Sequence, residues 1–342
     1  MRKTKILYLG ANSKDSTSLH RSRALARLGH EVCHINPLEW LPQNRILTSL
    51  NVRTGFRIVA PLCTAYVLKK IANAGYELAW IDQGGEVSPN LYKELKRRKI
   101  RIVNYNLDDP FGSRDGRKWD TYRKGVYLHD VTVVVRRENI EEAKIWGAQN
   151  VVRVFRSYDP VAHNPDKIPE SDVQRMASRV LFVGTHMPER GPFLEELIQR
   201  GVPLTIRGEG WKRAKSSLVR KAWHGGAIYN DEYVAAIKGA DLCLGLLSKG
   251  NRDLHTQRSA EIPYIGSVFC CERTEDHLEM FNQSESVAMW SSARECAEVC
   301  CKLVNDPQRR HKMAKVAKLR IQEIGLSNDA VMAGILERVK DF

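Results

Sequence analysis

The stretch KILYLG at residues 5–10 is a short apolar run that ends in glycine, which is typical of a buried strand. It is followed by STSLHRSRALARLG at 16–29, where leucine and alanine recur at helical spacing and Gly29 ends the helix. EVCHIN at 31–36 is a second apolar run. A strand, a helix and a strand in this order form a β-α-β unit, whose two strands are parallel. The first residues of the chain therefore predict an α/β fold.

The same alternation continues along the chain and is interrupted once. Before the interruption we expect strands at 78–82, 100–106, 131–135 and 151–155, and helices at 60–74, 90–99 and 139–148. After it we expect strands at 179–185, 202–210, 241–247 and 267–271, and helices at 188–201, 231–240, 292–304, 307–324 and 327–340. Repeated β-α-β units indicate parallel sheets with helices on both faces. The predicted fold class is α/β, with two doubly wound (Rossmann-like) domains.

The interruption, SYDPVAHNPDKIPESDVQRMAS at 157–178, holds three prolines and little periodicity, which is typical of a linker. We predict a first domain at 1–165, a linker at 166–178 and a second domain at 179–325. A C-terminal helix at 326–342 is expected to pack back toward the first domain. Ligands of doubly wound sheets bind beyond the carboxyl ends of the strands. Gly10 and Gly184 each end the first strand of a domain, so we expect both to face a ligand cleft.

The positive charge is concentrated in the first half of the chain. The formal net charge is +14, and residues 1–165 hold 28 Lys and Arg against 16 Asp and Glu, whereas residues 166–342 hold 26 against 24. A basic half suggests an anionic partner such as nucleic acid or a membrane surface. The alternative is charge that serves only solubility.

The eight cysteines form no pair of Cys-x-x-Cys motifs, so a zinc ribbon is not indicated. Most lie in apolar runs and are expected to be small buried residues. The N-terminus becomes polar after one strand, and no apolar stretch approaches the ~18 residues that a membrane-spanning helix needs. Free thiols without a secretory signal predict a cytoplasmic protein.

Several stretches together resemble the GT-B glycosyltransferases, most closely the spore-maturation (CgeB-like) group. They are FVGTHMPERGPFLEEL, LTIRGEGW and RSAEIPYIGSVFCCERTEDHLEMF in the second half, and NLDDPF and GAQNVVRVFRSYDPVAHNP in the first. The similarity covers most of the chain and is strongest over 180–290. It implies a GT-B arrangement, in which the domain at 179–325 holds a nucleotide-sugar donor and the domain at 1–165 lies on the acceptor side. It also implies that chemistry needs no bound metal and no cofactor besides a UDP- or GDP-sugar.

The resemblance assigns roles to two acids. Retaining GT-B enzymes related to family four often carry a Glu, seven residues and a second Glu. Glu261 occupies the second place, with Gly266 five residues later, and the resemblance implies that it binds the nucleotide ribose. Asp253 occupies the first place with a shorter side chain, where the resemblance implies a contact with the donor sugar. The alternative for Glu261 is an acid favoured at a helix start.

Three arginines are candidates for the donor phosphates, because guanidinium matches phosphate oxygens in a bidentate manner. Arg258 lies one helical turn before Glu261, Arg252 precedes Asp253, and Arg190 follows the glycine that ends the first strand of the second domain. The alternative for each is ordinary surface charge. Tyr229, just before a predicted helix, is a candidate to lie against the nucleobase.

Two residues of the first half are candidates for acceptor chemistry. Asp109 belongs to a pair of adjacent acids before a proline, which suggests a general base but is also a common turn. His20 opens a helix after the first strand, where a base could reach a ligand, although a lone histidine is usually structural.

The sequence thus predicts a glycosyltransferase whose basic first domain binds the acceptor. One candidate acceptor is DNA with a hydroxylated base, which would have to be flipped out of the duplex. The others are a polysaccharide, lipid or protein acceptor at the cell surface. The alternatives from other classes are a nucleotide-sugar epimerase and a non-catalytic binding protein of the same fold.

Overall fold

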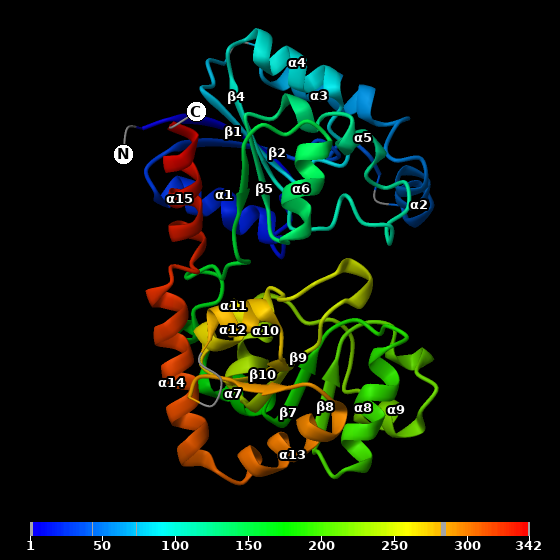
Figure 1. Cartoon of the computed structure of the whole chain (residues 1–342), viewed down its shortest axis with the longest axis vertical. Helices are drawn as coiled ribbons and strands as arrows, with labels where there is room; N and C mark the ends of the chain where they lie inside the picture. The colour runs from blue at the N-terminus through cyan, green and yellow to red at the C-terminus, as the bar shows by residue number, and fades with distance from the viewer. Residues whose placement is uncertain (1–2, 43, 73, 282–284, 341–342) are drawn as a thin grey trace. The chain divides into compact units, whose positions relative to one another are not determined.

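The computed structural model describes residues 3–42, 44–72, 74–281 and 285–340 (Figure 1). The chain forms two compact units. Unit 1 comprises Met1–Phe155, Lys249–Asp253 and Asn328–Phe342, and unit 2 comprises Arg156–Ser248 and Leu254–Ser327. Each unit is built on its own parallel sheet, so the predicted α/β class with two doubly wound domains is confirmed.

Unit 1 contains a six-stranded parallel sheet in the order β2-β1-β3-β4-β5-β6. Its strands are β1 (Lys5–Leu9), β2 (Glu31–Ile35), β3 (Leu78–Asp82), β4 (Arg101–Tyr105), β5 (Val131–Val134) and β6 (Val151–Arg153). Its helices are α1 (Thr17–Arg27), α2 (Arg45–Arg53), α3 (Ala60–Lys70), α4 (Pro89–Arg97), α5 (Asp120–Arg123), α6 (Glu138–Ile145) and α15 (Asn328–Lys340), with a 3-10 turn η1 (Val126–Leu128).

Alternate residues of β1 face two different apolar cores, as the pleat of a strand requires. Ile6 and Tyr8 belong to the core beneath α1 and α15, whereas Leu7 and Leu9 belong to the core beneath α3 and α4. All four side chains are buried. Both faces of the sheet are therefore covered by helices, which explains why its strands are nearly continuous apolar runs.

The last helix, α15, packs against α1 of unit 1 (Figure 1). Arg27 donates two hydrogen bonds to Asp329, at 2.8 and 2.7 Å, and Arg101 donates to the carbonyl oxygen of Val339 at 2.7 Å. Its apolar side contributes Met332 and Ile335 to the core. A segment from the end of the chain thus completes the unit formed by its beginning.

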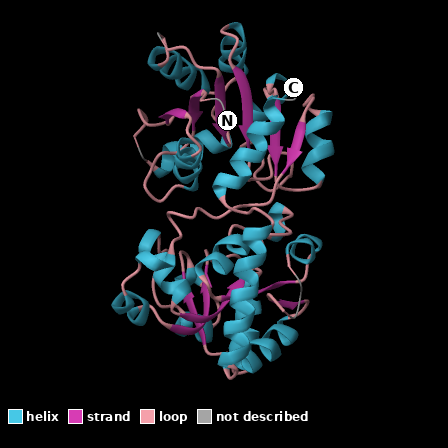
Figure 2. Ribbon diagram, turned by 90° about the vertical axis from the view of Figure 1, so that its left-hand side faces the viewer, coloured by secondary structure: helices cyan, strands magenta, loops and turns pink. Residues whose placement is uncertain are grey.

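Unit 2 contains a five-stranded parallel sheet in the order β11-β10-β9-β7-β8, flanked by helices (Figure 2). The strands are β7 (Ser178–Val183), β8 (Leu204–Arg207), β9 (Ala240–Gly245), β10 (Val268–Glu272) and β11 (Ala288–Trp290). The helices are α7 (Glu170–Arg175), α8 (Arg190–Gln199), α9 (Ser217–Ala222), α10 (Asn230–Lys238), α11 (Arg258–Ile265), α12 (Glu275–Met280), α13 (Ala293–Val304) and α14 (Pro307–Glu323). The 3-10 turns are η2 (Pro165–Lys167), η3 (Trp211–Arg213) and η4 (Lys249–Asn251), the last of which lies in unit 1.

The segment expected to be a linker at 166–178 is ordered structure of unit 2. It holds the end of η2, all of α7 and the first residue of β7, and the chain passes from unit 1 to unit 2 between Phe155 and Arg156. Proline is typical of linkers, but it is also favoured at the start of helices, where its missing N–H is not needed. Pro165 begins η2, and Pro169 directly precedes α7.

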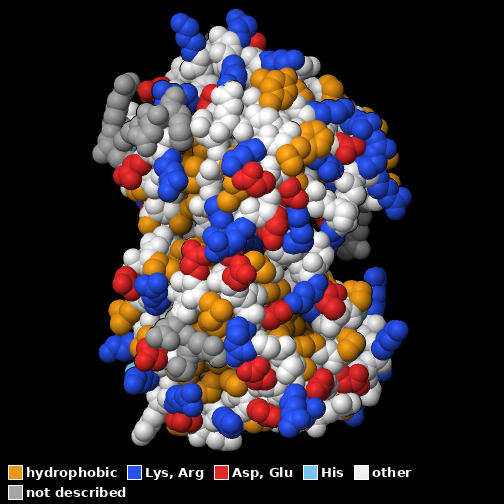
Figure 3. All heavy atoms as spheres, viewed as in Figure 1, with side chains coloured by type: hydrophobic (Ala, Val, Ile, Leu, Met, Phe, Trp, Pro, Cys, Tyr) orange, Lys and Arg blue, Asp and Glu red, His pale blue; other side chains and the backbone are white. Residues whose placement is uncertain are grey.

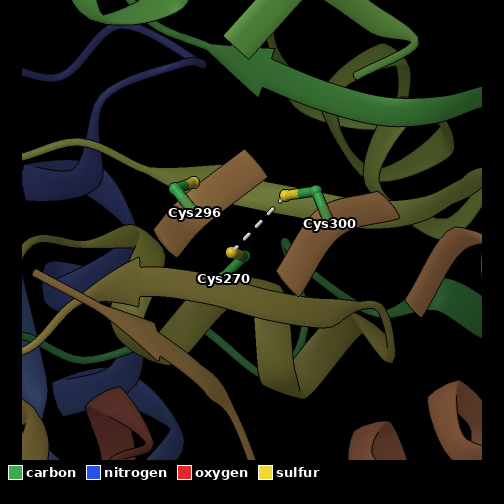
Figure 4. Close-up of side chains that lie close together, drawn as sticks. All are labelled: Cys270, Cys296 and Cys300. Atoms are coloured by element: carbon green, nitrogen blue, oxygen red, sulfur yellow. Dashed lines mark hydrogen bonds between the residues drawn. The ribbon is translucent and has the colours of Figure 1, made fainter. Parts of the chain in front are cut away.

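Three of the buried cysteines cluster in the core of unit 2 (Figure 4). Cys270 comes from β10, and Cys296 and Cys300 come from successive turns of α13, with their sulfur atoms within 4.8 Å of one another. Hydrogen bonds within the cluster and burial together raise the pKa of the Cys270 thiol. We infer that these side chains pack as small core residues, which agrees with the expectation that most cysteines are buried.

Candidate functional site

The loops after β7 and β9 flank the point where the strand order of unit 2 reverses. The chain runs from β7 outward to β8 and then returns to the other side of β7 with β9. Loops that leave such neighbouring strands separate and create a crevice in which ligands of doubly wound sheets bind. Gly184 begins the loop after β7, and Gly245 ends β9.

The backbone around Gly184 is packed too closely for side chains. The indole nitrogen of Trp211 donates a hydrogen bond to the carbonyl oxygen of Gly184 at 2.7 Å. A Cβ atom at Gly208 would lie 2.1 Å from the same oxygen, and the φ angle of Gly208 is 141°. These glycines let the loops after β7 and β8 approach each other at the carboxyl edge of the sheet.

Arg190, the first residue of α8, joins the two loops that flank the crevice. One terminal guanidinium nitrogen donates to the carbonyl oxygen of Thr185 at 2.9 Å, and the other donates to that of Leu246 at 3.2 Å. Thr185 follows β7 and Leu246 follows β9, and the arginine is only 9% exposed. Arg190 therefore fixes the spacing between the loops, a role that its position in the sequence did not reveal.

Glu261 lies in the first turn of α11 at the centre of a buried polar cluster. It is 3% exposed, and the hydroxyl of Tyr233 donates a hydrogen bond to its Oε2 at 2.5 Å. Nε2 of His163 lies 3.5 Å from Oε1. Burial and the carboxylate of Glu261 raise the pKa of Tyr233 well above its ordinary value, so the tyrosine remains a neutral donor.

Arg258 and Tyr229 lie beside this cluster. Arg258 begins α11, and its guanidinium carbon lies 5.5 Å from the centre of the Tyr233 ring, a cation–π contact. Tyr229 is the N-cap residue of α10, one turn before Tyr233, and 55% of it is exposed. Two predicted donor residues, Arg258 and Glu261, thus contact one tyrosine that the sequence did not single out. The backbone N–H of the same tyrosine donates to the carbonyl oxygen of Tyr229 at 3.3 Å.

Buried polar contacts hold α11 in position. Nδ1 of His255 lies 2.7 Å from Oδ2 of Asp276, and the hydroxyl of Ser259 lies 2.9 Å from Nε2 of His277. His277 in turn contacts the carbonyl oxygen of Glu272 at 2.7 Å. The helix that carries Arg258 and Glu261 is therefore fixed to the segment that follows β10.

Arg252 and Asp253 were expected to act beside Glu261, but the segment Lys249–Asp253 belongs to unit 1. Arg252 donates to both carboxylate oxygens of Asp109, at 2.7 and 2.6 Å, and also to Glu142 at 2.8 Å. Asp253 forms a buried ion pair with Arg136. The guanidinium of Arg252 is thus held by two carboxylates of the first unit, and its predicted role as a phosphate ligand stays a prediction.

Asp109 is 4% exposed, and both of its carboxylate oxygens accept hydrogen bonds. It accepts hydrogen bonds from Arg252, from the side chain of Asn139 at 2.9 Å and from the backbone of Gly112 at 3.1 Å. Burial alone would raise the pKa of Asp109, but the hydrogen bonds from Arg252 and Asn139 outweigh burial and lower it. A carboxylate with a lowered pKa is a weak base, so the geometry favours an anchoring role over the predicted base.

The corresponding crevice of unit 1, between β1 and β3, is occupied by a buried ion pair. Arg21 of α1 donates to Asp82 at the end of β3, at 2.7 and 3.0 Å, and the hydroxyl of Tyr8 donates to the same carboxylate at 2.5 Å. Gly10 lies at this edge, where a Cβ atom would meet the Ser18 hydroxyl at 2.3 Å. His20, the predicted base, is on α1 and only 8% exposed.

His129, another polar residue of the predicted acceptor side, is a core histidine. It is 3% exposed, its ring lies 4.8 Å from that of Tyr92, and Nδ1 lies 3.1 Å from the Thr132 hydroxyl. Burial, with a smaller effect from the positive charge of Lys96, lowers the pKa of His129 to about 3. The folded protein therefore keeps this side chain neutral over most of the acid range.

Replacing His129 with glutamine is expected to weaken the acid sensitivity of folding. The unfolded chain protonates this histidine below its ordinary pKa of about 6.5, whereas the folded chain does so only near pH 3. Stability is therefore lost as the pH falls from 6.5 toward 3, at about 1.4 kcal/mol per pH unit for this group. Urea unfolding at several pH values between 7 and 4 should show a shallower decline in the variant. The exposed His311→Gln serves as the control, and an equal slope in both variants would contradict the assignment.

The side chains that the sequence analysis did not identify are those that contact the predicted site residues from other segments of the chain. Tyr233, His163, Arg136 and Glu142 each contact a predicted site residue from a distant part of the chain. No local spacing signals such a contact. The only signal in the sequence is that a buried arginine follows the first strand of each unit: Arg21 follows β1, and Arg190 follows β7.

Comparison with known proteins identifies the fold. Residues 190–336 match the family model described as glycosyl transferase-like. No curated protein sequence matches the chain. Among solved structures, sucrose-phosphate synthase from Thermosynechococcus elongatus is similar over 98% of both chains, with 12% identity and a TM-score of 0.65. HepE from Anabaena, in complex with UDP and glucose, is similar over 99% of this chain and 100% of that one, with 13% identity and a TM-score of 0.66.

A third similar structure is described as trehalose-6-phosphate from E. coli bound with UDP-2-fluoro glucose, with 11% identity, 99% of both chains covered and a TM-score of 0.65. These structures share two Rossmann-like domains with parallel sheets, as found in units 1 and 2. The chain therefore has the GT-B fold of glycosyltransferases, and its residues 190–336 match the glycosyl transferase-like family.

Proposed function

We propose that the protein is a glycosyltransferase that binds a UDP-sugar at the crevice of unit 2 and transfers the sugar to an acceptor held by unit 1. The observation that carries the proposal is the Glu261 cluster on α11, within residues 190–336, which match the glycosyl transferase-like family. UDP is preferred over GDP because HepE and the E. coli structure are described with UDP or a UDP-sugar. We place the chain nearest the CgeB-like group, as a cytoplasmic hexosyl- or pentosyltransferase.

Glu261 is suited to binding the ribose hydroxyls. An ionised carboxylate offers about four acceptor sites, of which Tyr233 occupies one on Oε2, while His163 lies 3.5 Å from Oε1. The short hydrogen bond from Tyr233 fixes the rotamer of Glu261, so that little side-chain freedom is lost when a ribose binds. Tyr229, exposed one turn away, would lie against the uracil ring.

Arg258 is suited to the leaving diphosphate. In the transfer, the bond between the anomeric carbon and the phosphate oxygen breaks, its electron pair stays with the diphosphate, and the acceptor oxygen bonds to the anomeric carbon while losing its proton. A guanidinium already positioned by the Tyr233 ring stabilises the charge that develops on the diphosphate. Arg190 and Gly184 support this site by fixing the adjacent loops, and no metal ion is required by the proposal.

On the acceptor side, we assign Asp109 and Arg252 to anchoring the segment Lys249–Asp253. Asp253, held by Arg136, orients the same segment in unit 1 and takes no part in binding the donor sugar. His20, at the carboxyl edge of the unit 1 sheet, remains our candidate for the base that takes the acceptor proton. The excess positive charge of residues 1–165 favours an anionic acceptor, with DNA and membrane-surface glycans as the two candidates.

A screen of UDP- and GDP-sugars tests the proposal. The purified chain is expected to release free UDP from one UDP-sugar, slowly by hydrolysis and faster when a suitable acceptor is added. Release of an altered nucleotide-sugar without acceptor would indicate an epimerase, the class of enzyme named for a similar Listeria monocytogenes structure of 10% identity and TM-score 0.57. Binding of nucleotide without any turnover would indicate a non-catalytic protein.

A further inference from the structure

The segment at 40–76 of unit 1 has an unusual charge pattern. It contains five basic residues and no acidic residue, and it is flanked by Glu39 and Glu77. The segment holds α2 and α3, which the loop between them joins through Gly55 and Phe56, both with positive φ angles. Charge of a single sign over two consecutive helices indicates a surface that meets something anionic.

The same two helices and the turn between them expose large apolar side chains. The exposed fractions are 76% for Ile46, 46% for Leu50, 62% for Ile58 and 55% for Leu62. Ile46 and Leu50 are four residues apart within α2 and so lie on one side of that helix. Ile58 lies in the turn before α3, and Leu62 lies in the first turn of α3. Several large exposed apolar side chains within one short segment indicate an interaction site.

The apolar pairs lie among exposed basic residues. Arg53 follows Leu50 by three residues in α2, and Lys69 follows Leu62 by seven in α3, so each falls at helical spacing from a leucine of its own helix. Neither forms an ion pair with a residue that the structure describes, whereas Arg57 contacts Asp120 at 2.9 Å. In Figure 3, Lys and Arg side chains with hydrophobic ones between them cover the edge of unit 1 where Figure 1 places α2 and α3.

The helices are fixed to the body of the unit on their opposite side. Cys63 and Val67 of α3 are buried, and Val67 belongs to the core beneath the sheet. The hydroxyl of Thr64 lies 2.7 Å from that of Ser88, and the Thr121 hydroxyl donates to the carbonyl oxygen of Gly55. The exposed face is therefore presented by a folded, anchored structure and does not arise from a loose segment.

We propose that the surface formed by Ile46, Leu50, Arg53, Ile58, Leu62 and Lys69 docks onto a membrane of anionic lipids. Isoleucine and leucine would enter the boundary between headgroups and acyl chains, while the basic side chains would contact lipid phosphates. A protein partner is disfavoured because the cores of protein interfaces are depleted of lysine and enriched in aromatic residues. DNA is disfavoured because four exposed aliphatic side chains gain nothing from a phosphate backbone.

This docking mode differs from insertion, since none of the helices in the described part of the chain is long and apolar enough to cross a bilayer. It would place unit 1 at the lipid surface, which favours a membrane-borne acceptor over DNA for the proposed transfer. The docking itself does not depend on sugar transfer, so the two proposals can fail separately.

Flotation of the full-length chain with lipid vesicles tests the inference. We expect binding to vesicles of phosphatidylglycerol and phosphatidylcholine at low salt, and much weaker binding to vesicles of phosphatidylcholine alone. Arg53→Gln with Lys69→Gln should weaken binding about 25-fold, since each basic residue near an anionic surface contributes about fivefold. The matched control, Lys93→Gln with Lys124→Gln, changes two exposed lysines elsewhere in unit 1 and should bind as the parent does.

The apolar contribution is tested by Ile58→Glu with Leu62→Glu, which should abolish flotation. Ile145→Glu is the matched control, because Ile145 is 81% exposed on α6 of the same unit. Unchanged melting temperature and unchanged UDP-sugar hydrolysis would show that the variants are folded. The proposal is overturned if the parent does not bind anionic vesicles, or if the control variants lose binding equally. It is also overturned if Ile58→Glu with Leu62→Glu abolishes a homodimer or DNA binding while flotation persists.

Discussion

Substituting Asp82 with alanine is expected to lower the free energy of unfolding of unit 1 by about 3 to 5 kcal/mol, because it leaves the charge of Arg21 buried without its partner. The side chains of Arg21 and Asp82 are 2% and 1% exposed, and Tyr8 donates a third hydrogen bond to the carboxylate. Chemical denaturation of the variant measures the loss.

Two further variants separate the cost of an unpaired charge from the value of the ion pair. Arg21→Met with Asp82→Leu removes both charges and should recover most of the lost stability, since an apolar pair of similar volume often replaces a buried ion pair without penalty. Glu94→Ala, which breaks the exposed contacts to Arg97 and Arg98, should cost less than about 1 kcal/mol. The interpretation is wrong if Asp82→Ala costs no more than Glu94→Ala.

Replacing Glu261 with glutamine is expected to weaken UDP-sugar affinity by about 100-fold. Hydrogen bonds to a charged group contribute about 1.5 to 3 kcal/mol, which corresponds to a factor of about 10 to 150. Tyr233→Phe keeps the carboxylate but releases its rotamer, so a smaller loss of about fivefold is expected. Isothermal titration with the UDP-sugar chosen by the donor screen provides both values.

The control for this pair is Glu295→Gln, which changes a carboxylate of unit 2 that contacts Arg273 at 3.0 Å. Its UDP-sugar affinity should equal that of the parent. A purely structural role for Glu261 predicts a different result: Glu261→Gln would lower the melting temperature and leave the dissociation constant unchanged. That outcome would sink the ribose assignment while leaving the fold and the glycosyltransferase proposal standing.

Most of the secondary structure followed from local pattern, because a strand buried on both faces must be apolar throughout and a helix against a sheet must be apolar at every third or fourth position. The elements that escaped prediction are short or lack this signature. β11 has only three residues, and α7 stands among prolines that resemble a linker. Part of the apolar side of α2 is exposed, so the spacing of its apolar residues does not correspond to a buried helix face.

The candidate site was predictable only in part. Glu261 and Arg258 were identified from spacing along one segment, and the structure brings both to Tyr233. Arg252 and Asp253 come from the same stretch of sequence, yet they lie in unit 1 and contact Asp109 and Arg136. Spacing along the chain determines which residues share one face of a helix. It does not determine where residues that precede or follow the helix lie, as Arg252 and Asp253 do before α11.

The sequence by itself determined the fold class, the strand edges that carry Gly10 and Gly184, and the residue types at the candidate site on α11. These depend on periodicity and on short-range backbone geometry, which act between residues near one another in the chain. The tertiary structure alone decided that Arg190 joins two loops, that Arg21 and Asp82 fill the crevice of unit 1, and that Lys249–Asp253 belongs to that unit. Each of these results depends on which distant carboxylate or carbonyl group can satisfy a buried arginine, and such pairing becomes defined only when the sheets are assembled.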